Sequence, residues 1–123
     1  DIYTDGPQAA VEGYLKNFDS AMNKSDFSLI SGYLKNGSPI YTEQEKYVLR
    51  DITERLDSYE LTDVSHADTN NCVISTRETY YVQVKGKPLQ LMTQECKYNV
   101  ENQGDKWQLT SFADIKVVSR IKQ

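Results

Sequence analysis

The stretch that decides the fold is "RETYYVQVKGKPLQLMTQECKYNV", which runs from Arg77 to Val100. It predicts two strands joined at "KGKP" (85–88), because glycine and proline favour tight turns. Every second residue of the first strand belongs to one face, made by Cys72, Ile74, Thr76, Glu78, Tyr80, Val82 and Val84. This largely apolar face carries one acid in its middle. The role of Glu78 is therefore the main question that the sequence raises.

The second half of the chain continues this period-two alternation, which is typical of half-buried strands. We expect four strands, over residues 59–66, 72–85, 89–101 and 106–119. The three breaks between them are short and rich in Asn, Asp, Gly and Pro, so the strands should form a meandering antiparallel sheet. In the third strand the apolar residues change from odd to even positions after Leu91, which predicts a β-bulge in that strand.

The first half instead shows the 3.6-residue spacing of amphipathic helices. Its clearest apolar stripe consists of Val11, Tyr14, Leu15, Phe18, Ala21 and Met22. We expect this helix to start at Asp5-Gly6-Pro7, because proline is tolerated in a first turn. Ser25 is the candidate cap of a second helix that ends at Gly37, and Ser38-Pro39 should begin a third. The inner face of the third helix would carry Tyr47, Val48, Ile52, Arg55 and Leu56.

Helices followed by long antiparallel strands predict an α+β fold. The three N-terminal helices should cover the concave face of a curved antiparallel sheet of about four strands, because that face carries the apolar residues. The expected shape is a cone with a hollow between helices and sheet. We assign residues 1–8 to a linker or N-terminal tail and residues 9–123 to a single cone-fold domain.

The composition fits one globular domain and argues against some partners. The 123 residues are 38% hydrophobic and 26% charged, which is ordinary for a domain with one core. The formal net charge of −4 argues against a nucleic-acid partner, because phosphate backbones attract basic surfaces. No apolar run reaches the roughly 18 residues that cross a bilayer. Since the chain begins with Asp1 and has no leader-like segment, we expect it to be a fragment of a longer protein.

Glu78 could serve as a catalytic base, as a ligand-pocket residue or as a structural acid. An isolated acid in an apolar hollow can abstract protons, and Tyr80 and Tyr98 could act as hydrogen-bond donors beside it. Alternatively, Glu78 accepts hydrogen bonds from a tyrosine hydroxyl, a backbone N–H or Arg55, because a buried charge needs partners. We favour the structural or pocket-lining interpretation. Glu78, Tyr80, Tyr98 and Thr76 are expected to line a ligand pocket, and no catalytic residue is assigned.

The two cysteines, Cys72 and Cys96, are expected to be buried and free. Strand pairing across the turn at residue 86 places Cys72 opposite about Val100 and Cys96 opposite about Thr76. This offset of four residues is roughly 13 Å along a strand. A disulfide needs Cα atoms within about 7 Å, so the geometry disfavours a bond between the two thiols.

Other chemistry-bearing residues stand alone. His66 is the single histidine, and we expect it to be exposed at a strand end. No cluster of Asp, Glu, His or Cys has the spacing of a metal site, so we expect neither a metal nor a cofactor. Trp107 could stack on a sugar ring, but we favour a core residue that closes the sheet against the first helix. Tyr81 should point to the outer face of the sheet.

Several segments together resemble a known family. They are "NGSPIYTEQEKYV" (36–48), "VISTRETYYV" (73–82), "CKYNVENQGDKWQL" (96–109) and the closing "WQLTSFADIKV" (107–117). The order of three helices and a curved sheet resembles the nuclear-transport-factor-2-like (NTF2-like) cone fold. The segments resemble the C-terminal domain of TcaA-type proteins of Gram-positive bacteria, over about residues 9–118.

This resemblance implies an extracytoplasmic domain of a membrane-anchored cell-surface protein, whose cytoplasmic zinc-ribbon end and transmembrane helix lie outside this chain. It implies a link to cell-wall processes and to the response to glycopeptide antibiotics such as teicoplanin. We therefore expect a non-enzymatic binding domain, with a cell-wall component, a glycopeptide or a neighbouring membrane or surface protein as partner. The alternatives are an isomerase- or dehydratase-like enzyme with Glu78 as base, and a structural spacer or homodimerisation unit.

Overall fold

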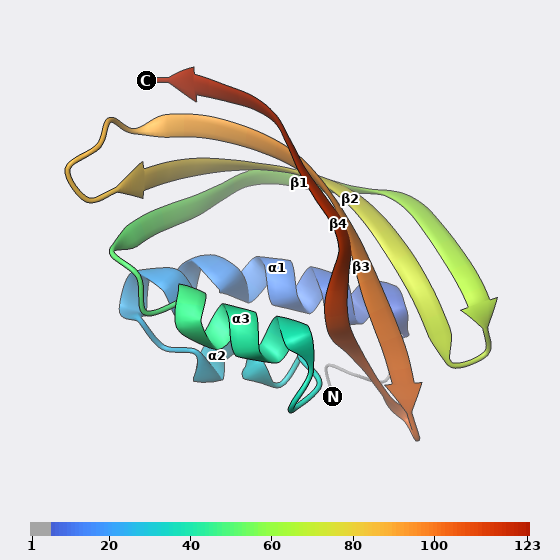
Figure 1. Ribbon diagram of the computed structural model, residues 1–123. Coiled ribbons are helices and arrows are strands. Elements are labelled where there is room, and N and C mark those ends of the chain that lie inside the picture. The colour runs from blue at the N-terminus through green and yellow to red at the C-terminus, as the bar shows by residue number, and fades with distance from the viewer. Residues whose placement is uncertain (1–5) are drawn as a thin grey trace.

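The computed structural model describes residues 6–123 and shows three helices packed on a four-stranded sheet (Figure 1). The helices are α1 (Pro7–Lys24), α2 (Ser28–Ser31) and α3 (Pro39–Tyr47), and the strands are β1 (Ile52–Asp68), β2 (Asn71–Val84), β3 (Gln90–Gln103) and β4 (Lys106–Lys122). The strands pair antiparallel in the order β1-β2-β3-β4. The sheet curves over the helices, and α1 lies along its concave side. The predicted α+β cone fold is confirmed.

Helix α1 starts where the proline predicts. Gly6 is its N-cap and Pro7 stands in its first turn, while Asp5 lies outside the described residues. Pro7 and Gln8 belong to the helix, although we assigned residues 1–8 to a tail. The predicted apolar stripe from Val11 to Met22 is buried against the sheet. No helix in the described part of the chain is long and apolar enough to span a membrane.

The second helix differs from the prediction at both ends. Ser25 does not cap it; Ser25 ends α1 in the left-handed conformation (φ 50°), and its N–H binds carbonyls of the last turn of α1. Asp26 instead accepts hydrogen bonds from the N–H and hydroxyl of Ser28. Helix α2 is one turn long and ends at Ser31, well before the predicted end at Gly37. Beyond Ser31 the backbone around Leu34 pairs with Leu109 of β4, which takes these backbone groups out of a helix.

The third helix begins as predicted but ends early. The Ser38 hydroxyl accepts a hydrogen bond from the Tyr41 N–H at 3.4 Å, as an N-cap should. The helix stops at Tyr47, and the segment from Ile52 to Leu56 forms the start of β1. Each of its five residues pairs with β2, and β-branched residues such as Ile52 and Thr53 fit a strand better than a helix. The first strand therefore begins seven residues before the predicted residue 59.

Arg55 consequently lies on the wrong face to contact Glu78. It pairs with Tyr81 across β1 and β2, and its guanidinium carbon lies 4.4 Å from the centroid of the Tyr81 ring. Successive side chains of a strand alternate between faces, so this pair lies on the convex side while Glu78 lies on the concave side. The outward orientation of Tyr81 is as predicted, but the predicted role of Arg55 as a partner of Glu78 is wrong.

The β-bulge predicted in the third strand is also wrongly placed. β2 and β3 pair without a register shift, with Tyr81 opposite Leu91 on the convex side. The apolar residues at odd positions of β3, such as Leu91, therefore lie on the convex face, and those at even positions lie on the concave face. The bulges lie on the outer strands instead. On β4, for example, Ser111 pairs with Asn99 and Leu109 pairs with the next residue of β3, Val100, so that one residue of β4 is left without a pairing partner. Similar shifts occur on β1, so both outer strands are irregular where the sheet bends.

The register confirms the prediction for the cysteines. Cys72 pairs with Val100 and Cys96 pairs with Thr76. Both thiols are free and both residues are buried, with 2% of their surface exposed.

The connection between α2 and α3 is tied to β4. Leu34 forms a parallel bridge with Leu109, whose N–H donates to the Tyr33 carbonyl and whose carbonyl accepts from the Lys35 N–H. These bonds hold the helical layer against the last strand. Trp107, nearby on β4, is half-buried and packs against the core from its margin, so it agrees with the predicted core position only in part.

Candidate functional site

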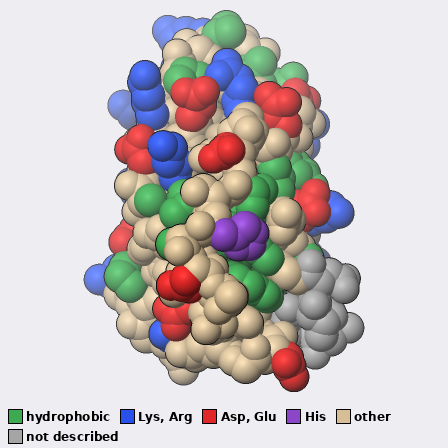
Figure 2. Space-filling model, turned by 90° about the vertical axis from the view of Figure 1, so that its right-hand side faces the viewer, with side chains coloured by type: hydrophobic (Ala, Val, Ile, Leu, Met, Phe, Trp, Pro, Cys, Tyr) green, Lys and Arg blue, Asp and Glu red, His purple; other side chains and the backbone are tan. Residues whose placement is uncertain are grey.

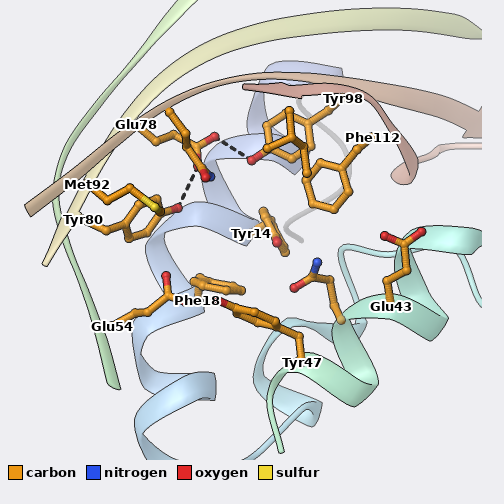
Figure 3. Close-up of a pocket in the computed structure, with 13 residues that line it drawn as sticks. Tyr14, Phe18, Glu43, Tyr47, Glu54, Glu78, Tyr80, Met92, Tyr98 and Phe112 are labelled. Atoms are coloured by element: carbon orange, nitrogen blue, oxygen red, sulfur yellow. Dashed lines mark hydrogen bonds between the residues drawn. The ribbon is translucent and has the colours of Figure 1, made fainter. Parts of the chain in front are cut away.

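A cavity of about 230 Å³ lies between the helices and the concave face of the sheet (Figure 3). The helices contribute Tyr14, Phe18, Glu43, Gln44 and Tyr47. The sheet contributes Glu54, Glu78, Tyr80, Met92, Tyr98 and Phe112, with Gln94 and Ile115 completing the lining. The predicted pocket residues Glu78, Tyr80 and Tyr98 therefore come together at one cavity. Large side chains narrow this hollow but do not fill it.

Glu78 is fully buried and its carboxylate is saturated by hydrogen bonds. Thr76 Oγ1 and the Tyr98 hydroxyl both donate to Oε2, each at 2.6 Å. The Tyr80 hydroxyl donates to Oε1 at 2.8 Å and Gln94 Nε2 donates to it at 3.2 Å. A carboxylate offers about four lone-pair positions. Four donors within the described residues therefore occupy the acceptor positions of Glu78, an arrangement typical of a structural acid.

Thr76 belongs to this network rather than to the cavity wall. Its side chain is buried on the same strand as Glu78, two residues away, and its hydroxyl is used by the Glu78 carboxylate. Of the four predicted pocket residues, Glu78, Tyr80 and Tyr98 line the cavity, and Thr76 donates a hydrogen bond to Glu78 from behind them.

Burial and the negative charge of Glu78 together raise the pKa values of the acidic groups around it. Burial first, and the charge of Glu78 second, raise the pKa of Tyr98 and of Tyr80 well above the usual value for tyrosine. Both hydroxyls therefore stay protonated and remain donors. The same two causes raise the pKa of the Cys96 thiol, so this cysteine is a neutral core residue and not a nucleophile.

Glu54 on β1 is a second buried acid at the cavity, with only 3% of its surface exposed. Its Oε2 accepts one hydrogen bond, from the Tyr47 hydroxyl at 2.5 Å. The pKa of Glu54 is raised to about 7: burial is the largest cause, the bond from Tyr47 opposes it, and the charges of Asp19 and Glu78 add to the rise. Glu54 is therefore the titratable acid of the cavity near neutral pH.

The helices add two more polar groups to the cavity, from Gln44 on α3 and Tyr14 on α1. Gln44 Oε1 is buried without a hydrogen bond, and the residue is 8% exposed. Tyr14 of α1 also lines the cavity, and Figure 3 shows its ring between the sheet and α3. Burial, followed by the charge of Glu78, raises the pKa of Tyr14, so its hydroxyl is a neutral donor or acceptor. The cavity thus holds open hydrogen-bonding positions.

Sequence reasoning missed Glu54 and Gln44, although signals for both exist. The segment "ITERL" (52–56) alternates as a strand does, which would have placed Glu54 on the same face as its apolar neighbours. Gln44 stands between Ile40 and Val48 at four-residue spacing, and both of these residues are fully buried. A polar residue on the apolar stripe of a helix is a candidate pocket residue.

The remaining candidates lie away from the cavity. His66 is exposed near the end of β1 and is the purple side chain on the face shown in Figure 2, where acidic and basic side chains are mixed. Trp107 lies by the β3–β4 turn, outside the cavity lining. Within residues 6–123, no three Asp, Glu, His or Cys side chains converge as a metal site would require.

Comparisons with known proteins place this geometry in a family. The family model described as the TcaA protein NTF2-like domain matches residues 5–113. A search of the curated proteins finds no match.

Solved structures with a similar fold include a ketosteroid isomerase-like protein from Erwinia carotovora atroseptica, with 14% identity, a TM-score of 0.69, and 92% of this chain and 94% of that chain covered. The intermembrane space region of chloroplast protein ARC6 has 11% identity and a TM-score of 0.71, with 94% of each chain covered. A hexachlorocyclohexane dehydrochlorinase has 8% identity and a TM-score of 0.68, with 94% and 88% covered. At these identities the likeness concerns the fold alone.

Proposed function

This chain belongs to the TcaA NTF2-like domain family, and on that basis we propose that it is a non-enzymatic ligand-binding domain of a membrane-anchored cell-surface protein. The domain would act outside the cytoplasm, in cell-wall processes and in the response to glycopeptide antibiotics. Its partner would be a cell-wall component, a glycopeptide or a neighbouring surface protein. The similar folds serve enzymes and other proteins alike, so the proposal depends on the site itself.

The observation that carries the proposal is the division of polar groups in the cavity. The central acid, Glu78, is occupied by four donors, which leaves it no proton-accepting position. The Gln44 side-chain oxygen faces the same cavity without a partner among the described residues, and the Tyr14 hydroxyl belongs to a ring of the lining. A pocket that is mostly apolar and holds a few open polar groups is the usual form of a binding site.

A titration followed by amide NMR tests this proposal. The labelled domain is titrated with soluble wall fragments, with teicoplanin and with a set of small fragments of mixed charge. We expect shifts that concentrate on the residues around the cavity, including Tyr14, Gln44 and Glu54. Shifts confined to the convex face of the sheet, or no shifts, would contradict a pocket and favour a protein-interaction or spacer role.

A second candidate function is a proton-transfer enzyme, but with Glu54 rather than Glu78 as base. The observation that favours it is the pKa of Glu54, about 7, at the same cavity as the neutral Tyr14 hydroxyl. A ligand found in the titration is incubated with the domain in D₂O, and the loss of its C–H signals is followed by proton NMR. Accelerated exchange that Glu54→Gln abolishes would establish the enzyme; unchanged C–H signals would support the binding domain.

A further inference from the structure

We propose that this cavity binds a small organic cation, with an N–H-bearing ammonium head and an apolar body. This inference depends on the proposed binding function and adds the chemical class of the ligand. Four features of the cavity carry it: the sign of its charges, its aromatic lining, one orphaned acceptor and its volume.

The charges at the cavity are negative and lack a cationic partner. Glu54 and Glu78 are buried in its wall and Glu43 is exposed on α3 at its edge, whereas no Lys, Arg or His lines it. All the donors to the two buried acids are neutral hydroxyl or amide groups. A cation entering the cavity would therefore gain the attraction of two carboxyl groups in a medium of low dielectric constant.

Two arginines lie nearby but do not supply this charge. The guanidinium carbon of Arg50 lies 5.6 Å from the centroid of the Tyr47 ring, and Arg120 donates to Gln90 at 3.4 Å. Both arginines lower the pKa of Tyr47, although burial and Glu54 raise it by more. Neither arginine belongs to the cavity lining. The two cations therefore lie outside the cavity and leave its interior negative.

The aromatic lining suits the same ligand. Six rings form a connected wall whose neighbouring centroids are 5.3 to 6.2 Å apart: Phe112, Tyr98, Tyr14, Phe18, Tyr47 and Tyr80. Ring faces carry partial negative charge and attract cations, at roughly 0.5 to 2 kcal/mol for each contact. The rings also provide apolar surface for the body of the ligand.

Gln44 gives independent support for a hydrogen-bond donor on the ligand. Its side-chain oxygen is buried, lines the cavity and has no partner. A carbonyl oxygen only accepts hydrogen bonds, and leaving one unpaired in a buried position costs about 1 to 3 kcal/mol. An ammonium N–H would satisfy it, whereas a quaternary ammonium could not. The volume of about 230 Å³ is below the roughly 300 to 1,000 Å³ typical of drug-size pockets, so the ligand must be small.

Three probes of one shape and different charge test this inference. Phenethylamine, 2-phenylethanol and phenylacetate share an aromatic body, and their head groups are cationic, neutral and anionic. Calorimetric titration at pH 8 keeps the amine charged while Glu54 is mostly ionised, because its pKa is about 7. We expect phenethylamine to bind at least about tenfold more tightly than the alcohol, and phenylacetate to bind most weakly. The trimethylammonium analogue should bind less tightly than phenethylamine.

Matched variants assign the preference to the cavity. Glu54→Gln removes the charge and keeps the shape, so it should weaken amine binding about tenfold and leave the alcohol unchanged. Gln44→Leu should reduce the preference for phenethylamine over its trimethylammonium analogue. Glu60→Gln removes an acid from the exposed side of the same strand and should change nothing.

The possible outcomes distinguish a failure of the proposed cation from a failure of the proposed binding function. If 2-phenylethanol or phenylacetate binds as tightly as phenethylamine or more tightly, the cavity does not select a cation, but the domain still binds small ligands. An amine preference that survives Glu54→Gln would also overturn it, because the cation would then bind elsewhere. Failure of all three probes and of the mixed fragment set at millimolar concentrations would overturn both the cation and the binding function.

Discussion

Two acids on the concave face of one sheet, Glu78 and Glu54, are about equally buried but differ in their partners. Glu78 accepts four hydrogen bonds, whereas Glu54 accepts one, from Tyr47. The donors to Glu78 come from two adjacent inner strands, β2 and β3, which pair in unbroken register. Glu54 lies on the outer strand β1, which has one neighbouring strand, and its carboxylate accepts from Tyr47 at the end of α3. The comparison teaches that position in the sheet decides whether a buried acid is structural or available to a ligand.

The largest effect should follow from removing the acceptor at Glu78. Glu78→Leu leaves four buried donors without a partner, and we expect a loss of at least about 4 kcal/mol in the free energy of unfolding. Glu78→Gln keeps the shape but loses charge-assisted bonds, so it should cost roughly 1.5 to 3 kcal/mol. Both values are measured by urea denaturation, with Glu60→Gln as the exposed control. An unchanged midpoint for Glu78→Gln would show that the network is not structural.

Glu54 should instead give the domain a stability that falls with rising pH. Its pKa rises from 4.5 in the unfolded chain to about 7 in the folded protein, so the folded state binds more protons between these values. The stabilisation is fully present below pH 4.5 and is lost as the pH rises through 7, by about 3 kcal/mol.

Denaturation curves from pH 4.5 to pH 8.5 measure this slope, and the comparison is between the natural chain and Glu54→Gln. Asp19 also has a pKa raised by burial, whereas Asp68 and Glu101 have lowered values, so the absolute slope contains several groups. The difference between the two proteins isolates Glu54. Parallel curves would mean that Glu54 ionises in the fold as it does in the unfolded chain.

The predictability of the two acids from sequence differs for the same structural reason. Glu78 was found because the strand from Cys72 to Val84 alternates without interruption, and the tight turn at residue 86 fixed its pairing with β3. Its tyrosine partners followed from that register. Glu54 was missed because "ITERL" follows a helix after a short turn, and its apolar spacing fits a helix as well as a strand. Only pairing with β2 decides between the two.

The same limit explains the misplaced bulge and the short second helix. Register shifts on β1 and β4 depend on how a curved sheet closes over the helices, which no local pattern records. Likewise, the helical length after Ser25 depends on how much apolar surface the sheet leaves to be covered. Local alternation thus predicts the inner strands and the acid network between them. The outer elements, which complete the cavity, require tertiary contacts.

A smaller effect should follow when each acid loses one hydrogen-bond donor, because Glu78 has four donors and Glu54 has one. Tyr47→Phe removes the only donor that Glu54 has among the described residues, so the pKa of Glu54 should move further above its raised value. Thr76→Val removes one of the four donors to Glu78 and should leave the pKa of Glu54 where it is. Carbon NMR of the side-chain carboxyl groups reads Glu54 directly, and each variant should cost about 1 kcal/mol in stability. A pKa of Glu54 that stays put in Tyr47→Phe would contradict the bond.

The smallest effect concerns the two thiols, which report on the charge of Glu78. Cys72 and Cys96 are equally exposed, but burial and the Glu78 charge raise the pKa of Cys96, whereas burial and the Asp63 charge raise that of Cys72. Both should react slowly with iodoacetamide at pH 8, and Cys96 should be the slower. Glu78→Gln loosens the fold and accelerates both reactions, so the informative quantity is the ratio of the two rates, read by mass spectrometry. A ratio that shifts towards Cys96 identifies the loss of the nearby charge, whereas an unchanged ratio would mean that opening of the fold alone controls both thiols.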